Sequence, residues 1–380
     1  MGDGAALPVN DSVKNPGELF LSQEAADRFL RFCEERALTD VFLQLPYKAE
    51  KTENAWEIRW DKAAVKALIL RLHKAGVRVH ALDGDPRFAL EPWHRLVLAV
   101  CRSVAAYNRT VPPEQRFDGI RFDNEPYLLE EFPGVRKQRI LRQYLLLLER
   151  IREAIDGEGL EFGVDIPFWF DEANAFFEPL TVVDERPLSE HVLDIVDNIG
   201  IMDYRTEAYG ADGVIAHAFG EIRYASANGK SVFVGLETTE IPDEILLEFG
   251  KGRGPTRLLL EDLRESRVRL RWLPEDSPPA ADGVFLFQTN RVLVPAEKLS
   301  FSRKNPVELF RVMEKVRGEL SGYPGFCGFA IHAYESFRVL IERERPSLSP
   351  VRDRDAGFSW GIPFCRNTPK PLQSGSRFRP

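Results

Sequence analysis

Residues 117–127 read Phe117-Asp-Gly-Ile-Arg-Phe-Asp-Asn-Glu-Pro-Tyr127, and this stretch decides both the fold and the candidate site. Side chains alternate between the two faces of a strand, so Ile120 and Phe122 are expected to share one face. The other face carries three ionisable side chains: Arg121, Asp123 and Glu125. A half-exposed strand with a solvated face is the simple alternative. We favour a functional strand, because buried charges are costly unless paired and catalytic groups lie at strand ends in strand–helix repeat folds.

Short apolar strands alternate with amphipathic helices along most of the chain. The predicted strands cover 41–45, 77–82, 118–125, 160–167, 198–204, 231–237 and 326–332, with an eighth in 5–10. The predicted helices cover 22–37, 61–75, 92–109, 133–155, 188–196 and 211–227. Repeated strand–helix units imply a parallel sheet. Eight of them, without a Gly-rich phosphate loop, predict an α/β fold of the closed (β/α)8 TIM-barrel type rather than an open, doubly wound sheet.

The domain organisation follows from the spacing of these units. Residues 1–345 are expected to form one TIM-barrel domain with an α+β insertion at 241–325, before the last strand. Within that insertion, helices at 256–267 and 304–320 and strands at 268–272 and 283–287 are predicted. The tail 346–380 is rich in Pro, Arg and Ser, and its composition predicts disorder.

Charge and composition exclude several classes of function. The net charge of -8 and a pI near 5.5 leave no electrostatic footprint for nucleic acid or an anionic membrane. No apolar run reaches the roughly 20 residues that span a bilayer. No signal peptide is visible, so a cytoplasmic location is the default, with secretion open if the N-terminus is incomplete. The four cysteines and six histidines show no metal-ligand spacing, so neither a metal nor a cofactor is predicted.

The predicted strand ends gather carboxylates and aromatic rings. They carry Asp83, Asp85, Asp123, Asn124, Glu125, Asp165, Trp169, Asp171, Met202, Tyr204, Arg205, Glu237, Glu240, His332, Tyr334 and Glu335. Carboxylates supply proton transfer, and flat aromatic rings stack on the apolar faces of sugars. This combination predicts a carbohydrate site.

These motifs resemble those of family 18 glycoside hydrolases, the chitinase type. Asp118-Gly-Ile-Arg-Phe-Asp-Asn-Glu125 is similar to the fourth-strand pattern Asp-Gly-x-Asp-x-Asp-x-Glu, with Arg121 in place of the middle Asp. Residues 198–204 resemble the sixth strand, where Met202 and Tyr204 match and Arg205 replaces Asp. Residues 231–236 and 328–332 resemble the seventh and eighth strands, with His332 in place of a Trp. The resemblance extends over residues 40–337.

The resemblance implies a retaining mechanism assisted by the substrate's own 2-acetamido group. Glu125 would protonate the leaving oxygen, Asp123 would orient the acetamido group, and Tyr204 would hydrogen-bond the cyclic intermediate. The candidate substrate-binding residues are Asn124, Arg121, Asp165, Trp169, Met202, Arg205, Glu237, His332 and Tyr334. Arg121 is expected to pair with Asp123 on the same strand face and hold it ionised, which would restrict the mechanism.

Three other hypotheses remain open. Asn124-Glu125-Pro126 resembles the Asn-Glu-Pro of clan A glycosidases, in which Glu125 would be the acid/base and Glu237 the nucleophile of a double displacement. The replacements at Arg121, Arg205 and His332 would also suit a non-catalytic sugar-binding barrel. Finally, an acidic cluster could hold a divalent cation in a different barrel enzyme, with the ligands Asp83, Asp85, Asp123 and Asp165.

Overall fold

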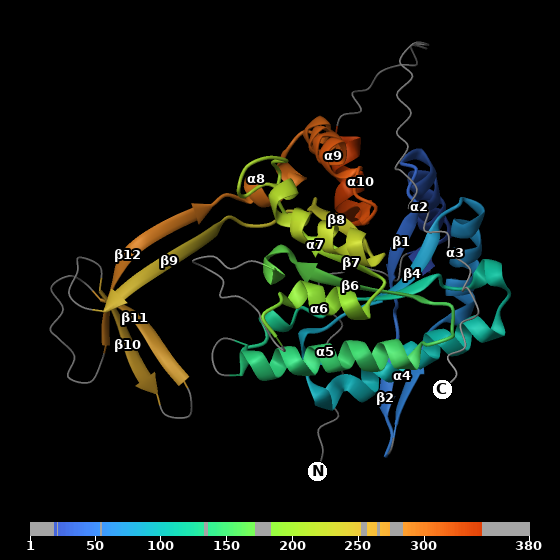
Figure 1. Cartoon of the computed structure of the whole chain (residues 1–380), viewed down its shortest axis with the longest axis horizontal. Helices are drawn as coiled ribbons and strands as arrows, with labels where there is room; N and C mark the ends of the chain where they lie inside the picture. The colour runs from blue at the N-terminus through green and yellow to red at the C-terminus, as the bar shows by residue number, and fades with distance from the viewer. Residues whose placement is uncertain are drawn as a thin grey trace, which may run out of the picture.

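A parallel sheet of seven strands forms the centre of the computed structural model (Figure 1). The structure describes residues 19–20, 22–53, 55–132, 136–171, 184–251, 257–263, 267–273 and 284–343. The strands lie side by side in chain order: β1 (Asp40–Gln44), β4 (Arg78–Asp83), β5 (Gly119–Phe122), β6 (Glu161–Pro167), β7 (Asn198–Met202), β8 (Ser231–Glu237) and β13 (Phe326–His332). All seven predicted strands are confirmed.

The sheet is strongly curled. Phe42 of β1 and Phe233 of β8 belong to strands that are not neighbours in the sheet, yet their ring centroids lie 5.6 Å apart. Side chains from distant strands therefore meet inside the curl, as in a TIM barrel. The α/β barrel class predicted from the repeats is confirmed. The eighth strand expected at 5–10 lies outside the described residues.

Helices cover the outside of the sheet. They are α2 (Gln23–Glu35), α3 (Lys62–Lys74), α4 (Glu91–Thr110), α5 (Lys137–Ala154), α6 (Leu188–Ile195), α7 (Val214–Asn228), α9 (Pro306–Leu320) and α10 (Tyr334–Glu342). Side-chain caps explain several of the boundaries. Asp61 accepts two backbone N–H groups at the start of α3, and a capping box of Asn305 and Glu308 begins α9. α7 ends at Gly229, whose φ of 65° suits glycine.

Helix α2 lies over the region between the two outer strands of the sheet, β1 and β13. The ring of Tyr334, just after β13, packs edge-on against Phe29 and Phe32 of α2 at 4.6 and 5.3 Å. Phe32 also contacts Phe337 of α10 at 5.4 Å. These contacts of the half-buried Tyr334 and the buried phenylalanine rings connect α2 to the last strand–helix unit.

The insertion before β13 contains an antiparallel sheet with the order β11-β10-β12-β9. Its strands are β9 (Glu244–Lys251), β10 (Arg257–Leu263), β11 (Arg267–Leu273) and β12 (Val284–Val294). β9 and β12 run away from the barrel in Figure 1, with β10 and β11 at their far end. The predicted strands at 268–272 and 283–287 and the helix at 304–320 are confirmed. The helix predicted at 256–267 is wrong, because strand pairing with β11 overrides the local pattern.

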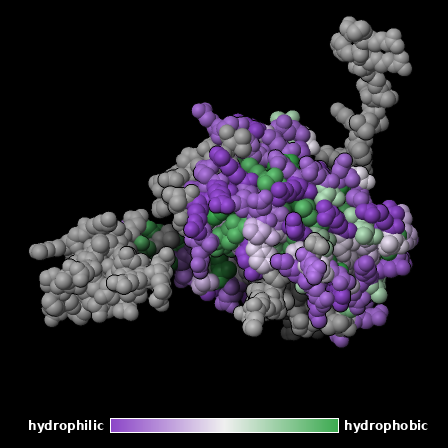
Figure 2. All heavy atoms as spheres, turned by 90° about the horizontal axis from the view of Figure 1, so that it is seen from below, coloured by the Kyte–Doolittle hydropathy of each residue, from purple (hydrophilic) through white to green (hydrophobic). Residues whose placement is uncertain are grey.

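Short elements complete the connections. They are the hairpin β2 (Lys48–Lys51) and β3 (Trp56–Arg59), the helix α8 (Ala296–Leu299), and the single turns η1 (Pro86–Ala89), η2 (Pro113–Gln115), η3 (Pro126–Leu128), η4 (Phe168–Phe170) and η5 (Phe301–Arg303). The face shown in Figure 2 is mainly hydrophilic in its described part, with hydrophobic residues in separate groups. None of the helices in the described ranges is long and apolar enough to cross a bilayer.

Candidate active site

Strand β5 ends earlier than the sequence predicts. It stops at Phe122, and Glu125 adopts the left-handed conformation with φ 42° and ψ 57° before Pro126 opens η3. Arg121, Asp123 and Glu125 therefore do not continue one strand face, and that prediction is wrong. A left-handed residue other than glycine costs about 1 kcal/mol or more, and such residues are frequent at functional sites.

A glycine on the neighbouring strand end allows this turn to approach closely. The Asp123 N–H still donates to the Asp83 carbonyl at 2.9 Å, so the chain beyond β5 stays bonded to the end of β4. A Cβ at Gly84 would lie 2.0 Å from the Asp123 carbonyl oxygen. Only glycine fits there, because a real side chain would push the Asp123 backbone away.

Arg121 lies inside the barrel, with its side chain 1% exposed. Its Nε and Nη2 donate to the Asp165 carboxylate on β6 at 2.7 to 3.0 Å, and its Nη1 donates to Asn198 on β7 at 2.8 Å. The guanidinium also stacks 4.2 Å from the centroid of the Phe42 ring. The expected pairing of Arg121 with Asp123 is therefore wrong. The direction of the strand's side chains predicts an inward Arg, but the partner comes from the neighbouring strand.

Asp123 is left without an ionic partner. Its Oδ1 is buried and accepts no hydrogen bond in the structure. The pKa of the carboxyl is raised well above 3.8, first by burial and then by repulsion from Asp165 and Glu125, which outweighs the attraction of Arg121. The expectation that Arg121 holds Asp123 ionised is thus also wrong. Instead, its surroundings favour the protonated form of Asp123 more than water favours it for a free aspartate.

Glu125 is oriented by a tyrosine from its own turn. The Tyr127 hydroxyl donates to Glu125 Oε2. The Tyr127 ring packs edge-on against Trp169 of η4, with centroids 5.2 Å apart, so the strand ends of β5 and β6 meet beside the carboxylate. Burial and the charge of Glu125 raise the pKa of Tyr127, so the phenol remains a hydrogen-bond donor. We did not select Tyr127 from sequence, although it lies two residues from Glu125 across a proline turn.

The other side of the site, opposite Glu125 and Tyr127, is formed by Tyr204, Glu237 and His332. The rings of Tyr204 and His332 are stacked with centroids 6.3 Å apart, and His332 Nδ1 is bonded to Glu237 Oε2 at 2.9 Å. Glu237 Oε1 accepts the backbone N–H and the hydroxyl of Thr239 at 2.6 and 2.7 Å. The His332–Ala333 peptide bond is cis.

Electrostatic interactions show that the two sides face each other. The pKa of Tyr204 is raised by burial and by four carboxyl groups: Glu237, Asp123, Asp165 and Glu125. The pKa of His332 is raised, mainly by its hydrogen bond to Glu237, with Asp165 and Glu125 contributing. Acids from the segment after β5, from β6 and from β8 thus converge on the tyrosine that follows β7, at the carboxyl ends of the strands.

The remaining predicted residues have different surroundings. Asn124 is 1% exposed, and both polar atoms of its side chain are buried without a hydrogen bond. Met202 is half-buried as the last residue of β7. Arg205 is bonded to Asp212 at 2.7 Å and lies over the Phe168 ring at 4.8 Å. Tyr334 is occupied by its packing against α2, so the structure does not bring it into the group around Glu125.

Of the four carboxyls considered for a divalent cation, all but Asp123 have separate partners. Asp83 accepts from the Tyr47 hydroxyl at 2.8 Å, Asp85 is paired with Arg87, and Asp165 is paired with Arg121. Within the described ranges, no three His, Cys, Asp or Glu side chains are arranged to hold a metal ion.

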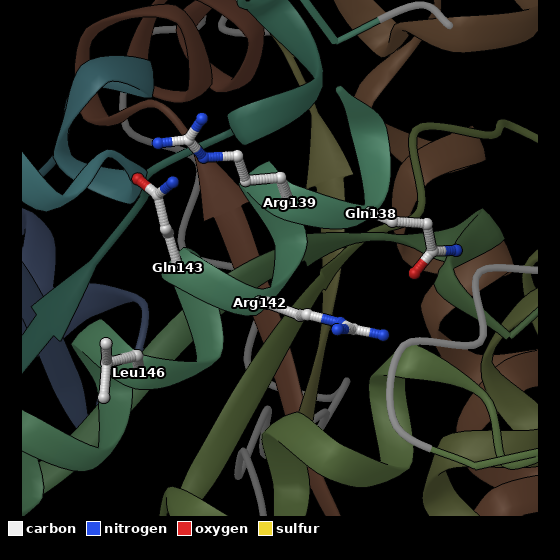
Figure 3. Close-up of a pocket in the computed structure, with 5 residues that line it drawn as sticks. All are labelled: Gln138, Arg139, Arg142, Gln143 and Leu146. Carbon is white, nitrogen blue, oxygen red and sulfur yellow. The ribbon is translucent and has the colours of Figure 1, made fainter. Parts of the chain in front are cut away.

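A hollow of about 430 Å³ lies elsewhere, on the surface of α5 (Figure 3). Its lining consists of Gln138, Arg139, Arg142, Gln143 and Leu146. All five belong to one helix on the outside of the barrel, and none carries a carboxyl group or an aromatic ring. This hollow is distinct from the strand-end group, and the described residues that line it include no carboxylic acid.

Asp83 gives the fold a pH dependence that can be measured. Burial raises its pKa from 3.8 to about 6 in spite of its hydrogen bonds. Because the folded state binds this proton more tightly, Asp83 contributes stability that is fully present below about pH 4 and is lost as the pH rises through 6. The loss amounts to about 3 kcal/mol in the free energy of unfolding. We expect Asp83→Asn to remove this contribution, so that the free energy of unfolding measured in urea falls less between pH 4 and 7 than in the unchanged protein. Equal pH dependence in both proteins would contradict the assignment.

Known proteins resemble this chain only at a distance. No family profile and no curated protein matches the chain. Among solved structures, a chitinase from Chromobacterium violaceum shows 12% identity over 85% of this chain and 96% of its own, with a TM-score of 0.43.

Two further structures show the same degree of likeness. The spore cortex-lytic enzyme SleL of Bacillus megaterium has 11% identity, 83% and 70% coverage and a TM-score of 0.41. A GH18 chitinase from Cycas revoluta, in complex with (GlcNAc)3, has 12% identity, 78% and 89% coverage and a TM-score of 0.41. With TM-scores below 0.5, these likenesses carry no conclusion about the reaction, which has to come from the side chains.

Proposed function

We propose that this protein is a retaining glycoside hydrolase that acts on sugars carrying a 2-acetamido group. The observation that carries the proposal is the state of Asp123. Asp123 is half-buried, its Oδ1 is buried without a partner, and the carboxyl lies in electrostatic contact with Glu125 and Tyr204. An unsatisfied buried oxygen is costly, so the site favours a ligand that donates a hydrogen bond to it.

The proposed reaction breaks the bond between the anomeric carbon and the leaving oxygen. Glu125 gives its proton to that oxygen, while the acetamido oxygen of the substrate bonds to the anomeric carbon. Asp123 accepts the acetamido N–H, and the Tyr204 hydroxyl donates to the acetamido oxygen. Glu125 then takes a proton from water, whose oxygen opens the cyclic intermediate with overall retention. The hydrogen bond from Tyr127 keeps Glu125 in one orientation through both steps.

The double displacement with Glu237 as nucleophile is supported less well. Both oxygens of Glu237 are already engaged, by His332 and by Thr239. A carboxylate that accepts three hydrogen bonds is a weaker nucleophile than a free one, because attack removes the charge those donors stabilise. We assign Glu237 to fixing His332 beside Tyr204.

Matched substrates test the proposal. We expect the purified chain to hydrolyse aryl N-acetyl-β-glucosaminides or N-acetylated oligosaccharides, and to leave the corresponding 2-hydroxyl glucosides intact. A thiazoline that mimics the cyclic intermediate should inhibit competitively. Hydrolysis of both sugar types, without thiazoline inhibition, would support double displacement instead. Binding measured by calorimetry with no turnover of any substrate would identify a sugar-binding barrel and end the enzymatic proposal.

A further inference from the structure

A chain of polar side chains runs through the interior of the barrel. Glu161, the first residue of β6, is bonded to Arg78 of β4 at 2.6 Å and to the Asn198 amide at 2.5 Å. Asn198 in turn accepts from Arg121, and Arg121 holds Asp165. The chain therefore extends from the amino ends of the strands to Asp165, which borders the candidate active site.

Two glycines make room for the guanidinium at the centre of this chain. A Cβ at Gly163 of β6 would lie 2.7 Å from Arg121 Nη1, and a Cβ at Gly200 of β7 would lie 2.3 Å from Nη2. The barrel interior is thus shaped around the ion pair of Arg121 and Asp165. The packing indicates that the pair is a built part of the interior, because β6 and β7 each have a glycine at the point where the pair lies.

Asp123 faces several ionisable groups. They are Arg121 and Glu125 from its own segment, Asp165 from β6, Tyr127 from η3, Tyr144 from α5 and Tyr204 after β7. The pKa of each tyrosine is raised, so all three stay neutral. The charge around Asp123 is therefore decided by Arg121, Asp165 and Glu125.

We propose that Asp165, held by Arg121 across two strands, is a positioning residue that decides the charge and the hydrogen-bond partner of Asp123. The inference rests on the proposed function in giving Asp123 its role, and it explains how the site works with an Arg at position 121. Asp165 accepts from Nε and Nη2 of the guanidinium through three contacts at 2.7 to 3.0 Å, and Nη1 donates to Asn198. Asp165 thereby keeps Arg121 from capturing Asp123 and leaves the Asp123 oxygen free for the substrate.

The Asp165→Asn variant distinguishes an electrostatic effect of Asp165 on Asp123 from a role of Asp165 in packing alone. The variant keeps the size of the side chain but frees the charge of Arg121 next to Asp123. The repulsion by Asp165 disappears at the same time, so both changes favour the ionised form of Asp123. We expect the Asp123 titration midpoint to fall by about one pH unit or more. The readout is the ¹³C carboxyl resonance of labelled aspartate, assigned with Asp123→Asn.

Asp197→Asn is the matched control. Asp197 is also paired with an arginine, Arg152 at 2.9 Å, but it lies just before β7 at the opposite end of the same strands. The control should leave the Asp123 midpoint unchanged. The titration needs no turnover, so the inference can fail while the hydrolase proposal holds, and the reverse. An unchanged midpoint in Asp165→Asn overturns the inference.

A second variant keeps the test decisive if Asp165→Asn does not fold. The double variant Arg121→Gln/Asp165→Asn leaves no unpaired buried charge. Asp165 acts on Asp123 more strongly than Arg121 does, so removing both should still lower the midpoint, by less than the single variant. A midpoint that stays the same or rises in the double variant overturns the inference.

Discussion

Glu125→Gln is expected to slow hydrolysis of an N-acetylated substrate with a poor leaving group by about 10³-fold. Gln cannot donate a proton to the leaving oxygen, although it has the same shape and still accepts from the Tyr127 hydroxyl. A dinitrophenolate leaves without protonation, so the loss on a dinitrophenyl glycoside should be much smaller. The measurement is kcat/KM for the two leaving groups.

Two further variants serve as comparisons for Glu125→Gln. Tyr127→Phe removes the group that orients Glu125 and should cost about tenfold, because positioned proton donors lose only part of their effect when misaligned. Glu240→Gln changes an exposed carboxyl that follows β8, and it should leave kcat/KM unchanged. Equal losses for the two leaving groups in Glu125→Gln would show that Glu125 binds substrate without acting as the acid.

Arg121→Leu is expected to be the most destabilising single change in the barrel interior. It removes three hydrogen bonds to Asp165 and one to Asn198, and it leaves a partly buried carboxylate without its counter-ion. Breaking one partner of a buried pair costs about 3 to 5 kcal/mol. Urea unfolding followed by circular dichroism would measure the loss.

Arg109→Leu is the matched control for that measurement. Arg109 makes a similarly close pair with Glu158, at 2.8 Å, but on the surface. Exposed ion pairs contribute little, so the unfolding midpoint should barely move. If the urea unfolding midpoint of Arg121→Leu is similar to that of the unchanged protein, the interior ion pair does not stabilise the fold. The chain of polar side chains would then have no role in stability.

Local sequence patterns were sufficient for most of the barrel. The apolar strand runs and their helices recur with short turns, so burial of one element forces the placement of the next. The pattern failed at Leu258-Leu-Leu260, in β10, where an apolar run fits a helix or a strand and only the pairing with β11 decides. The hairpin of β2 and β3 was also not expected, because its exposed, charged strands carry a weak pattern.

The residues of the candidate site were likewise predicted only in part from the sequence. The positions of Asp123, Glu125, Tyr204, Glu237 and His332 at strand ends follow from strand length and chain order, and their convergence was expected. Tyr127 was missed, since a proline turn with left-handed Glu125 redirects its ring in a way that alternation does not describe. Whether the convergent carboxyls perform the proposed chemistry is what the variants test.

The amino-acid sequence alone determined that parallel strands and helices alternate and that acids gather at one edge of the sheet, because both properties are local and periodic. Only the tertiary structure decided which acid carries the counter-ion. Arg121 and Asp123 are two residues apart, yet the register of β5 and β6, with Arg121 opposite Gly163, puts Asp165 of the next strand against the guanidinium. Ion pairing depends on distance in space, and it left Asp123 without a counter-ion and with a raised pKa.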